Sequence, residues 1–214
     1  FSPSLRTSRF IWSGKGSPTA SSGDNWIDTV ADKSGNVICI PHIDQDEFIN
    51  MDCSTEPVKL SLTRFGVPAG ELGSNKYLSG SVHPNGNIYM APFNSDSFLE
   101  VDVVNETYTK YDTGEGTGNS LCQSTITGAD GNIYGVPWMA NTVLMLNPTT
   151  GVVSDFLTHG KGEQAYLGGT AAPNGNIYMA PYDADEILEI DPLAGTSSFL
   201  TLPTNTYSAG PDQP

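Results

Sequence analysis

Two pairs of aspartates separated by one residue are the clearest candidate metal ligands in this sequence. Asp44 and Asp46 belong to one acidic turn, and Asp183 and Asp185 occupy the corresponding place in another. Carboxylate oxygens are preferred ligands of Ca²⁺, so both turns are candidate sites for calcium or another divalent cation. The glycine and distal glutamate of an EF-hand loop do not follow either pair. We therefore favour solvated hairpin turns and predict no cofactor, with a divalent cation as the alternative.

A series of ring-bearing side chains is the best candidate for ligand binding. His42, Phe93, Trp138 and Tyr182 each follow a proline at the same place in a repeated motif. Equivalent positions in successive repeats project in equivalent directions, so these rings could form a face that binds a small molecule, glycan or peptide. The alternative, which we favour, is that the rings pack between neighbouring sheets.

The sequence carries no recognisable catalytic motif. It has no Ser/His/Asp order, Cys-x-x-Cys pair or glycine-rich phosphate loop followed by a lysine and a helix. The Gly-Glu-Gly-Thr-Gly run from Gly114 to Gly118 is interpreted as a loop between repeats. His42, His83 and His159 fall at different repeat positions, so they do not predict a shared site.

The elements that position these residues come from a unit repeated four times. The copies cover residues 33–52, 84–102, 129–147 and 173–191, and their turn glycines stand at positions 35, 86, 131 and 175. Each copy reads as a turn of the Asn-Gly kind, a β-prone run ended by proline, a ring, a polar turn and a second apolar run. The turn dipeptide predicts a two-residue type I′ turn.

A period near 45 residues built from short strands is typical of a propeller blade. In the last repeat we expect strands over 164–172, 176–180, 186–190 and 197–202. The predicted fold is therefore all-β, a β-propeller of four-stranded antiparallel blades. We expect about five blades, four of them complete and one split between the two termini.

The predicted domain organisation is a single β-propeller domain over residues 1–214. The repeats span about 25–76, 77–119, 120–163 and 164–206, and residues 1–12 and 207–214 resemble the fourth and first strands of a further blade. That shared closing blade would lack a middle hairpin of about 17 residues, judged from the other repeats. Either the chain is a fragment of a longer array, which we favour, or it forms a five-unit ring with a defective blade. The incomplete blade also predicts self-association.

Charge and hydropathy restrict the partners. The chain has 9 Lys and Arg against 24 Asp and Glu, a net charge of −15. Phosphate binding needs clustered basic residues, so we expect no nucleic acid and no anionic membrane as a partner. No apolar run reaches 18 residues and no signal peptide is visible, which predicts a soluble protein of unassigned compartment. The first residue is Phe1 rather than Met, which suggests a processed or excised chain.

The pattern Gly-Asn-Ile-Tyr-x-x-Pro followed by Leu-x-Ile-Asp-Pro resembles the repeats of the NHL, SMP-30/gluconolactonase and virginiamycin B lyase group of β-propellers. The resemblance covers about residues 25–214. It implies the fold, and for function it implies lactonases or a lyase with a metal in the central channel, or binding and scaffold modules. Where the lyase repeats carry a Trp-Phe-Thr-Glu-like run, this chain has Ile-Tyr-Met-Ala-Pro. We therefore predict a non-enzymatic binding or scaffold module, with a metal-dependent hydrolase or lyase as the alternative.

Overall fold

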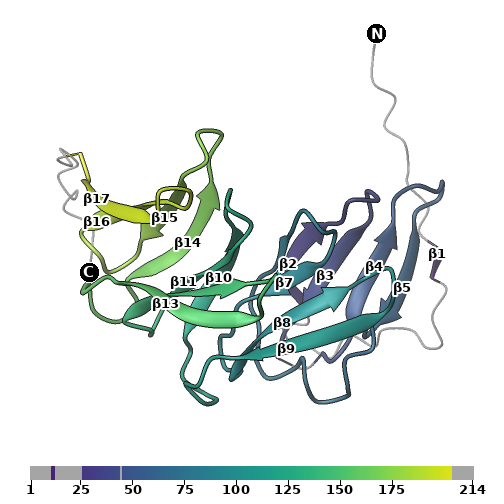
Figure 1. The fold of residues 1–214 in the computed structure, drawn as a ribbon. Coiled ribbons are helices and arrows are strands. Elements are labelled where there is room, and N and C mark those ends of the chain that lie inside the picture. Colours follow the sequence, from purple (N-terminus) through teal and green to yellow (C-terminus); the bar gives the residue numbers. More distant parts are fainter. Residues whose placement is uncertain (1–10, 13–25, 44, 204–214) are drawn as a thin grey trace, which may run out of the picture.

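The computed structural model describes residues 11–12, 26–43 and 45–203. Strands are the only regular elements found in this part of the chain, and they form four sheets (Figure 1). No helix long and apolar enough to cross a membrane occurs among the described residues. The all-β prediction is confirmed.

Each sheet is built on an antiparallel meander of four strands that are consecutive in the chain. The first sheet contains β2 (Trp26–Ala31), β3 (Val37–Pro41), β4 (Phe48–Asp52) and β5 (Lys59–Thr63). The second contains β6 (Ser81–Val82), β7 (Ile88–Met90), β8 (Ser97–Asp102) and β9 (Thr107–Asp112). The third contains β10 (Cys122–Thr127), β11 (Ile133–Pro137), β12 (Thr142–Asn147) and β13 (Val152–Thr158). The fourth contains β14 (Tyr166–Ala171), β15 (Ile177–Pro181), β16 (Glu186–Asp191) and β17 (Thr196–Thr201).

The turn that joins the first two strands of each sheet differs from the predicted type. In the fourth sheet the Gly175 N–H donates to the Ala172 carbonyl at 2.9 Å, and the Ala172 N–H donates to the Asn176 carbonyl at 2.8 Å. Only the glycine of this turn has a positive φ, 91°, whereas a type I′ turn requires two such residues. The Asn174 side chain accepts the Asn176 N–H at 3.1 Å. The hairpin is thus a type I turn with a glycine bulge, and the asparagine acts through its side chain.

Three buried apolar clusters lie between successive sheets. One joins the first sheet to the second and includes Ile40 and Met90. Another joins the second sheet to the third and includes Tyr89 and Leu144. The third joins the third sheet to the fourth. Because each thin sheet buries its apolar residues against its neighbour, the four sheets follow one another in an arc, with β2–β5 and β14–β17 at its two ends (Figure 1).

The edge of the first sheet carries a short additional strand. β1 (Ile11–Trp12) pairs in parallel with β5, with Ile11 opposite Lys59 and Trp12 opposite Leu60. The sequence placed these two residues in a closing blade shared between the termini. Residues 1–10 and 207–214, which make up most of that predicted blade, lie outside the described residues. The shared blade and the total of about five blades therefore remain predictions.

Candidate functional site

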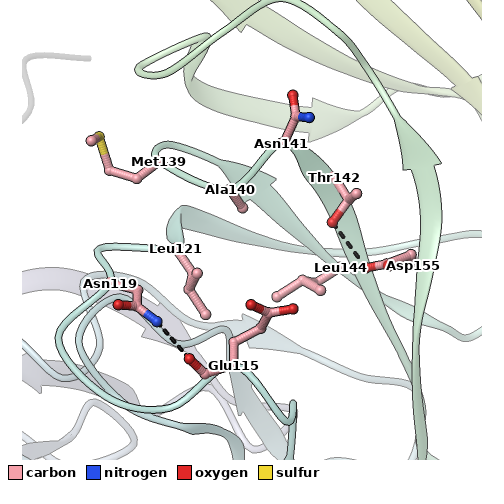
Figure 2. A pocket seen from close by; sticks show the side chains of 9 residues that line it. All are labelled: Glu115, Asn119, Leu121, Met139, Ala140, Asn141, Thr142, Leu144 and Asp155. Atoms are coloured by element: carbon pink, nitrogen blue, oxygen red, sulfur yellow. Dashed lines mark hydrogen bonds between the residues drawn. The ribbon is translucent and has the colours of Figure 1, made fainter.

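A pocket of about 330 Å³ lies where the chain passes from the second sheet to the third. One wall is the segment 113–121 between β9 and β10, and the other is formed by the turn 138–141 and the strands β12 and β13 (Figure 2). Its lining residues are Glu115, Asn119, Leu121, Met139, Ala140, Asn141, Thr142, Leu144 and Asp155.

The pocket combines a buried apolar floor with a polar, exposed rim. Leu121, Ala140 and Leu144 are buried. Glu115 and Asp155 on the rim are exposed, and Figure 2 shows the Glu115 carboxylate directed into the space between Leu121 and Leu144. Neither Lys, Arg nor His belongs to the lining, so two carboxylates set the sign of its electrostatic potential. The pocket therefore favours a small ligand with a positively charged group.

The loop that carries Glu115 is shaped by glycines. Gly114, Gly116 and Gly118 have φ values of 78°, 76° and 81°, a backbone conformation that glycine adopts without steric cost. The Gly118 N–H donates to the Asn94 carbonyl at 3.1 Å, and Asn119 Nδ2 donates to the Glu115 carbonyl at 2.6 Å. These bonds fold the loop over the second sheet. The loop joins two sheets, which confirms its interpretation as a connection between repeats.

Hydrogen bonds of Thr142 and His159 support the opposite wall of the pocket. Thr142 Oγ1 donates to Asp155 Oδ1 at 2.9 Å, which fixes one rim carboxylate across β12 and β13. His159 is buried behind the turn, with its Nε2 3.0 Å from the Ala140 carbonyl oxygen. Burial lowers the pKa of His159. The imidazole is therefore a neutral support of the wall.

The structure brings two of the four predicted ring residues together. The ring centroids of Trp138 and Tyr182 lie 5.1 Å apart with planes tilted by 55°, and Tyr182 is 55% exposed. His42 is buried, and Phe93 is half-buried. None of the four lines the pocket. A ligand-binding role for this ring series remains a prediction.

The backbones of two ring residues join neighbouring repeats. The Phe93 carbonyl accepts the Leu121 N–H at 2.9 Å, and the Trp138 carbonyl accepts the Gln164 N–H at 2.5 Å. Leu121 and Gln164 each lie just before the first strand of the next sheet. The backbone at these two positions therefore links one sheet to the next, and packing of the rings between sheets remains a prediction.

The predicted aspartates that fall in the described part of the chain are engaged in other contacts. Asp46 accepts the N–H groups of Gly70 and Leu72 at 2.5 and 3.0 Å, so it organises the loop after β5. Asp185 pairs with Lys161 Nζ at 2.8 Å, which lowers the pKa of its carboxyl group.

The other two predicted metal ligands are Asp183 and Asp44. Asp183 is exposed, and Asp44 lies outside the described residues. Within the described ranges, no group of three or more His, Cys, Asp or Glu side chains is positioned to hold a metal ion. The metal-binding role of the four aspartates remains a prediction.

Sequence reasoning missed the residues that line the pocket. Glu115 and Asn119 come from a connection between repeats, whereas Asn141 and Asp155 come from a turn and an outer strand of one repeat. These positions are not equivalent in the repeat, so comparing the copies could not group them. The three glycines around Glu115 were the available signal, because they indicate a connection with an unusual backbone path.

The face-to-face stacking of four-stranded meanders with their first strands adjacent defines a propeller-type repeat protein. The chain belongs to the DUF6923 family, described as a repeat of unknown function, whose model matches residues 58–212. No curated protein matches the chain.

Solved propeller-type structures share this fold at low sequence identity. A catalytically inactive virginiamycin B lyase from Staphylococcus aureus, in complex with quinupristin, is 14% identical with a TM-score of 0.68 over 87% of this chain and 58% of that one. An auxiliary nutrient binding protein from Bacteroides ovatus is 12% identical with a TM-score of 0.62, over 87% of this chain and 44% of that one.

A third similar structure is a 6-phosphogluconolactonase-like protein from Bacteroides uniformis, at 14% identity and a TM-score of 0.56. The match covers 81% of this chain and 53% of that protein. This chain thus spans about half the length of these three proteins. Their roles are mixed, so the comparison establishes the fold and leaves the function to the site.

Proposed function

We propose that this chain is a non-enzymatic binding module whose pocket between the second and third sheets takes a small molecule with a positively charged group, such as an amino sugar. The observation that carries this proposal is the pairing of two rim carboxylates, Glu115 and Asp155, with a buried apolar floor. A volume of about 330 Å³ is at the lower end for ligand pockets, which suits one sugar ring or one amino acid.

The chemistry of the lining supports an amine with an attached polyol. An ammonium group between the carboxylates of Glu115 and Asp155 would form charge-assisted hydrogen bonds, which are stronger than neutral ones. The amides of Asn119 and Asn141 can each donate to and accept from hydroxyl groups. The apolar edge of the ligand would lie against Leu121. A metal-dependent hydrolase or lyase activity, by contrast, is supported by fold similarity alone, and one fold serves many functions.

Titration calorimetry with three matched compounds tests this proposal. Glucosamine, glucose and gluconate have similar size but carry a positive, zero and negative charge. We expect glucosamine to bind at least about tenfold more tightly than glucose, a difference of about 1.4 kcal/mol. Gluconate should not bind, because its carboxylate would face two others.

Two variants and one matched control complete the experiment. Glu115→Gln and Asp155→Asn should each weaken glucosamine binding about three- to tenfold, since each removes one charge-assisted hydrogen bond. Glu163→Gln changes an exposed carboxylate outside the pocket and should leave binding unchanged. Equal affinity for all three compounds, or binding that is insensitive to both variants, would disprove the proposal.

A further inference from the structure

The two end sheets of the arc each have one face that lies outside the three buried clusters. On the fourth sheet this face carries Tyr178, Ala180, Ile187, Glu189 and Leu200, because Tyr178 pairs with Glu189 and Ile187 pairs with Leu200. The opposite face of the same sheet is buried against the third sheet. Ala180 is exposed and Leu200 is 38% exposed. We call this surface the outer face of the fourth sheet.

The equivalent surface of the second sheet is buried inside the chain. The second and fourth repeats share the run Pro-Asn-Gly-Asn-Ile-Tyr-Met-Ala-Pro. Tyr89 and Ala91, which correspond to Tyr178 and Ala180, are 0% and 2% exposed beneath the third sheet. The same sequence thus forms a face that the third sheet covers in the second repeat. In the fourth repeat this face lies outside the buried clusters.

The polar groups on the outer face are already satisfied within the fourth sheet. Glu189 accepts hydrogen bonds from Asn176 Nδ2 at 2.8 Å, Tyr178 Oη at 2.7 Å and Ser198 Oγ at 2.9 Å. In the second sheet Glu100 accepts the matching bonds from Asn87 and Tyr89, and there the tyrosine is fully buried. A sheet can therefore be placed over this face without leaving these polar groups unpaired.

The first sheet has a face of the kind that covers such a network. The third sheet packs on the second through Ile133, Gly135, Leu144 and Leu146. The residues of the first sheet at the same repeat positions are Val37, Cys39, Ile49 and Met51, and all four are half-buried. They lie on the side of the first sheet opposite Ile38, Ile40 and Phe48, which are buried against the second sheet.

The known contact between the second and third sheets predicts which residues would meet. A Cβ built on Gly135 would lie 3.3 Å from the Cβ of Ala91. The equivalents of these two residues are Cys39 on the first sheet and Ala180 on the fourth. If a first sheet covers a fourth sheet in the same way, these two side chains come into contact.

We propose that the outer face of the fourth sheet is the docking surface for the first sheet of a second copy of this chain. The two copies associate head to tail, and the propeller continues from one chain into the next. Such an interface joins two different surfaces, so it produces either a closed ring or an open filament. The described residues of two copies contain eight sheets, each built on a four-stranded meander, which is within the range of about four to eight blades known for propellers. The expected assembly is therefore a two-chain ring.

A disulfide trap tests the proposed contact. Ala180→Cys is introduced together with Cys53→Ser, because Cys53 is exposed and Cys122 is buried. After mild oxidation we expect a new disulfide between Cys39 of one copy and position 180 of the other, seen as a covalent dimer on a non-reducing gel. Adding Cys39→Ser should abolish it. Val152→Cys in the same background is the matched control, since Val152 is 57% exposed on the third sheet and should give no bond to Cys39.

Light scattering on a sizing column gives an independent readout with the unmodified chain. We expect twice the monomer mass, and we expect Ile49→Glu to weaken association at least about tenfold because it places a charge in the contact. Circular dichroism confirms that each variant is folded. A monomer in which position 180 bonds to Cys39 of the same chain would show that the ring closes within one copy. A monomer without that bond would show that the faces do not associate, and either result overturns the proposal.

Discussion

At the scale of single residues, His159 shows how a buried imidazole becomes sensitive to acid. Its Nδ1 accepts the Lys161 N–H at 3.2 Å, so Nε2 carries the proton and donates to the Ala140 carbonyl. The ring is 4% exposed and packs edge-to-face on Tyr166, with centroids 5.7 Å apart. A second proton on Nδ1 would break the bond from Lys161 and place a charge among buried groups. The folded protein therefore disfavours protonation.

This environment predicts a pH-dependent stability. The folded pKa of His159 lies below 6.5, so the unfolded chain binds more protons as the pH falls through 6.5. The contribution of His159 to the free energy of unfolding is fully present above pH 6.5 and is lost progressively down to the lowered folded pKa. In urea titrations between pH 8 and 5, the wild type should lose stability more steeply than His159→Gln. Parallel curves for the two proteins would contradict this account.

Residue type alone did not decide residue role in this chain. Asp46 was a candidate metal ligand, yet its carboxylate holds the N–H groups of a loop and lies 3.4 Å from Arg64 Nε. These partners stand at positions 64, 70 and 72, well outside the acidic turn that made Asp46 a candidate.

At the scale of elements, the hairpin of the second and fourth sheets contains a recurring Asn–Tyr–Glu network. In the second sheet Glu100 accepts Tyr89 Oη at 2.6 Å, Asn87 Nδ2 at 2.5 Å and Tyr111 Oη. Burial and these bonds to Glu100 raise the pKa of both tyrosines, which remain protonated donors. The third sheet replaces this arrangement with Asp130, which accepts Tyr134 Oη at 3.0 Å. The network joins the turn to the two middle strands and rigidifies each hairpin.

A matched pair of substitutions separates the effect of the network from the effect of its burial. Glu100→Gln removes the charge that accepts the buried Tyr89 hydroxyl and should reduce the free energy of unfolding by about 1–3 kcal/mol, as expected for hydrogen bonds to a charged group. Glu189→Gln makes the same change on the outer face of the fourth sheet, and its loss should be clearly smaller because water can replace the bonds.

Chemical denaturation in dilute protein, where chains are not associated, measures both effects. Each variant is compared with the wild type, and the slope against denaturant should stay the same, so that the midpoint reports stability. Equal losses for the two glutamates would mean that covering by the third sheet does not strengthen the network.

At the scale of the whole molecule, negative charge greatly exceeds positive charge. Acidic residues outnumber basic ones by 24 to 9, and several basic groups are already paired, such as Lys161 with Glu186 at 2.6 Å. The remaining carboxylates repel one another in the folded chain more than in the expanded unfolded chain. Salt screens this repulsion over a distance of about 8 Å at physiological ionic strength.

Thermal stability should therefore rise with ionic strength. Between about 0.02 and 0.3 M NaCl we expect the midpoint of unfolding to increase by about 2–4 °C, corresponding to roughly 1 kcal/mol for a chain of this size. Potassium chloride is the control, and it should act equally because screening does not depend on the identity of the monovalent cation. A much larger, saturable rise with millimolar CaCl₂ would contradict a purely screening effect and would indicate calcium bound at the acidic turns.

The sequence by itself determined the repeat, the position of its hairpins and the fold class. Strands predicted over 176–180 and 186–190 were found as Ile177–Pro181 and Glu186–Asp191. These features were predictable because a turn glycine, a β-prone run and a terminating proline act on neighbouring residues. Each copy of the motif repeats the same local instructions.

Only the tertiary structure decided which faces are covered, where the pocket lies and which charges meet. Tyr89 and Tyr178 stand in identical local sequences, yet the first is fully buried and the second is half-buried. Glu115 and Asp155 line one pocket although 39 positions separate them in the chain. Burial depends on what packs against a sheet from elsewhere, and short-range patterns carry no record of that partner. For this reason the sequence predicted the blades, and the arrangement of the blades defined the site.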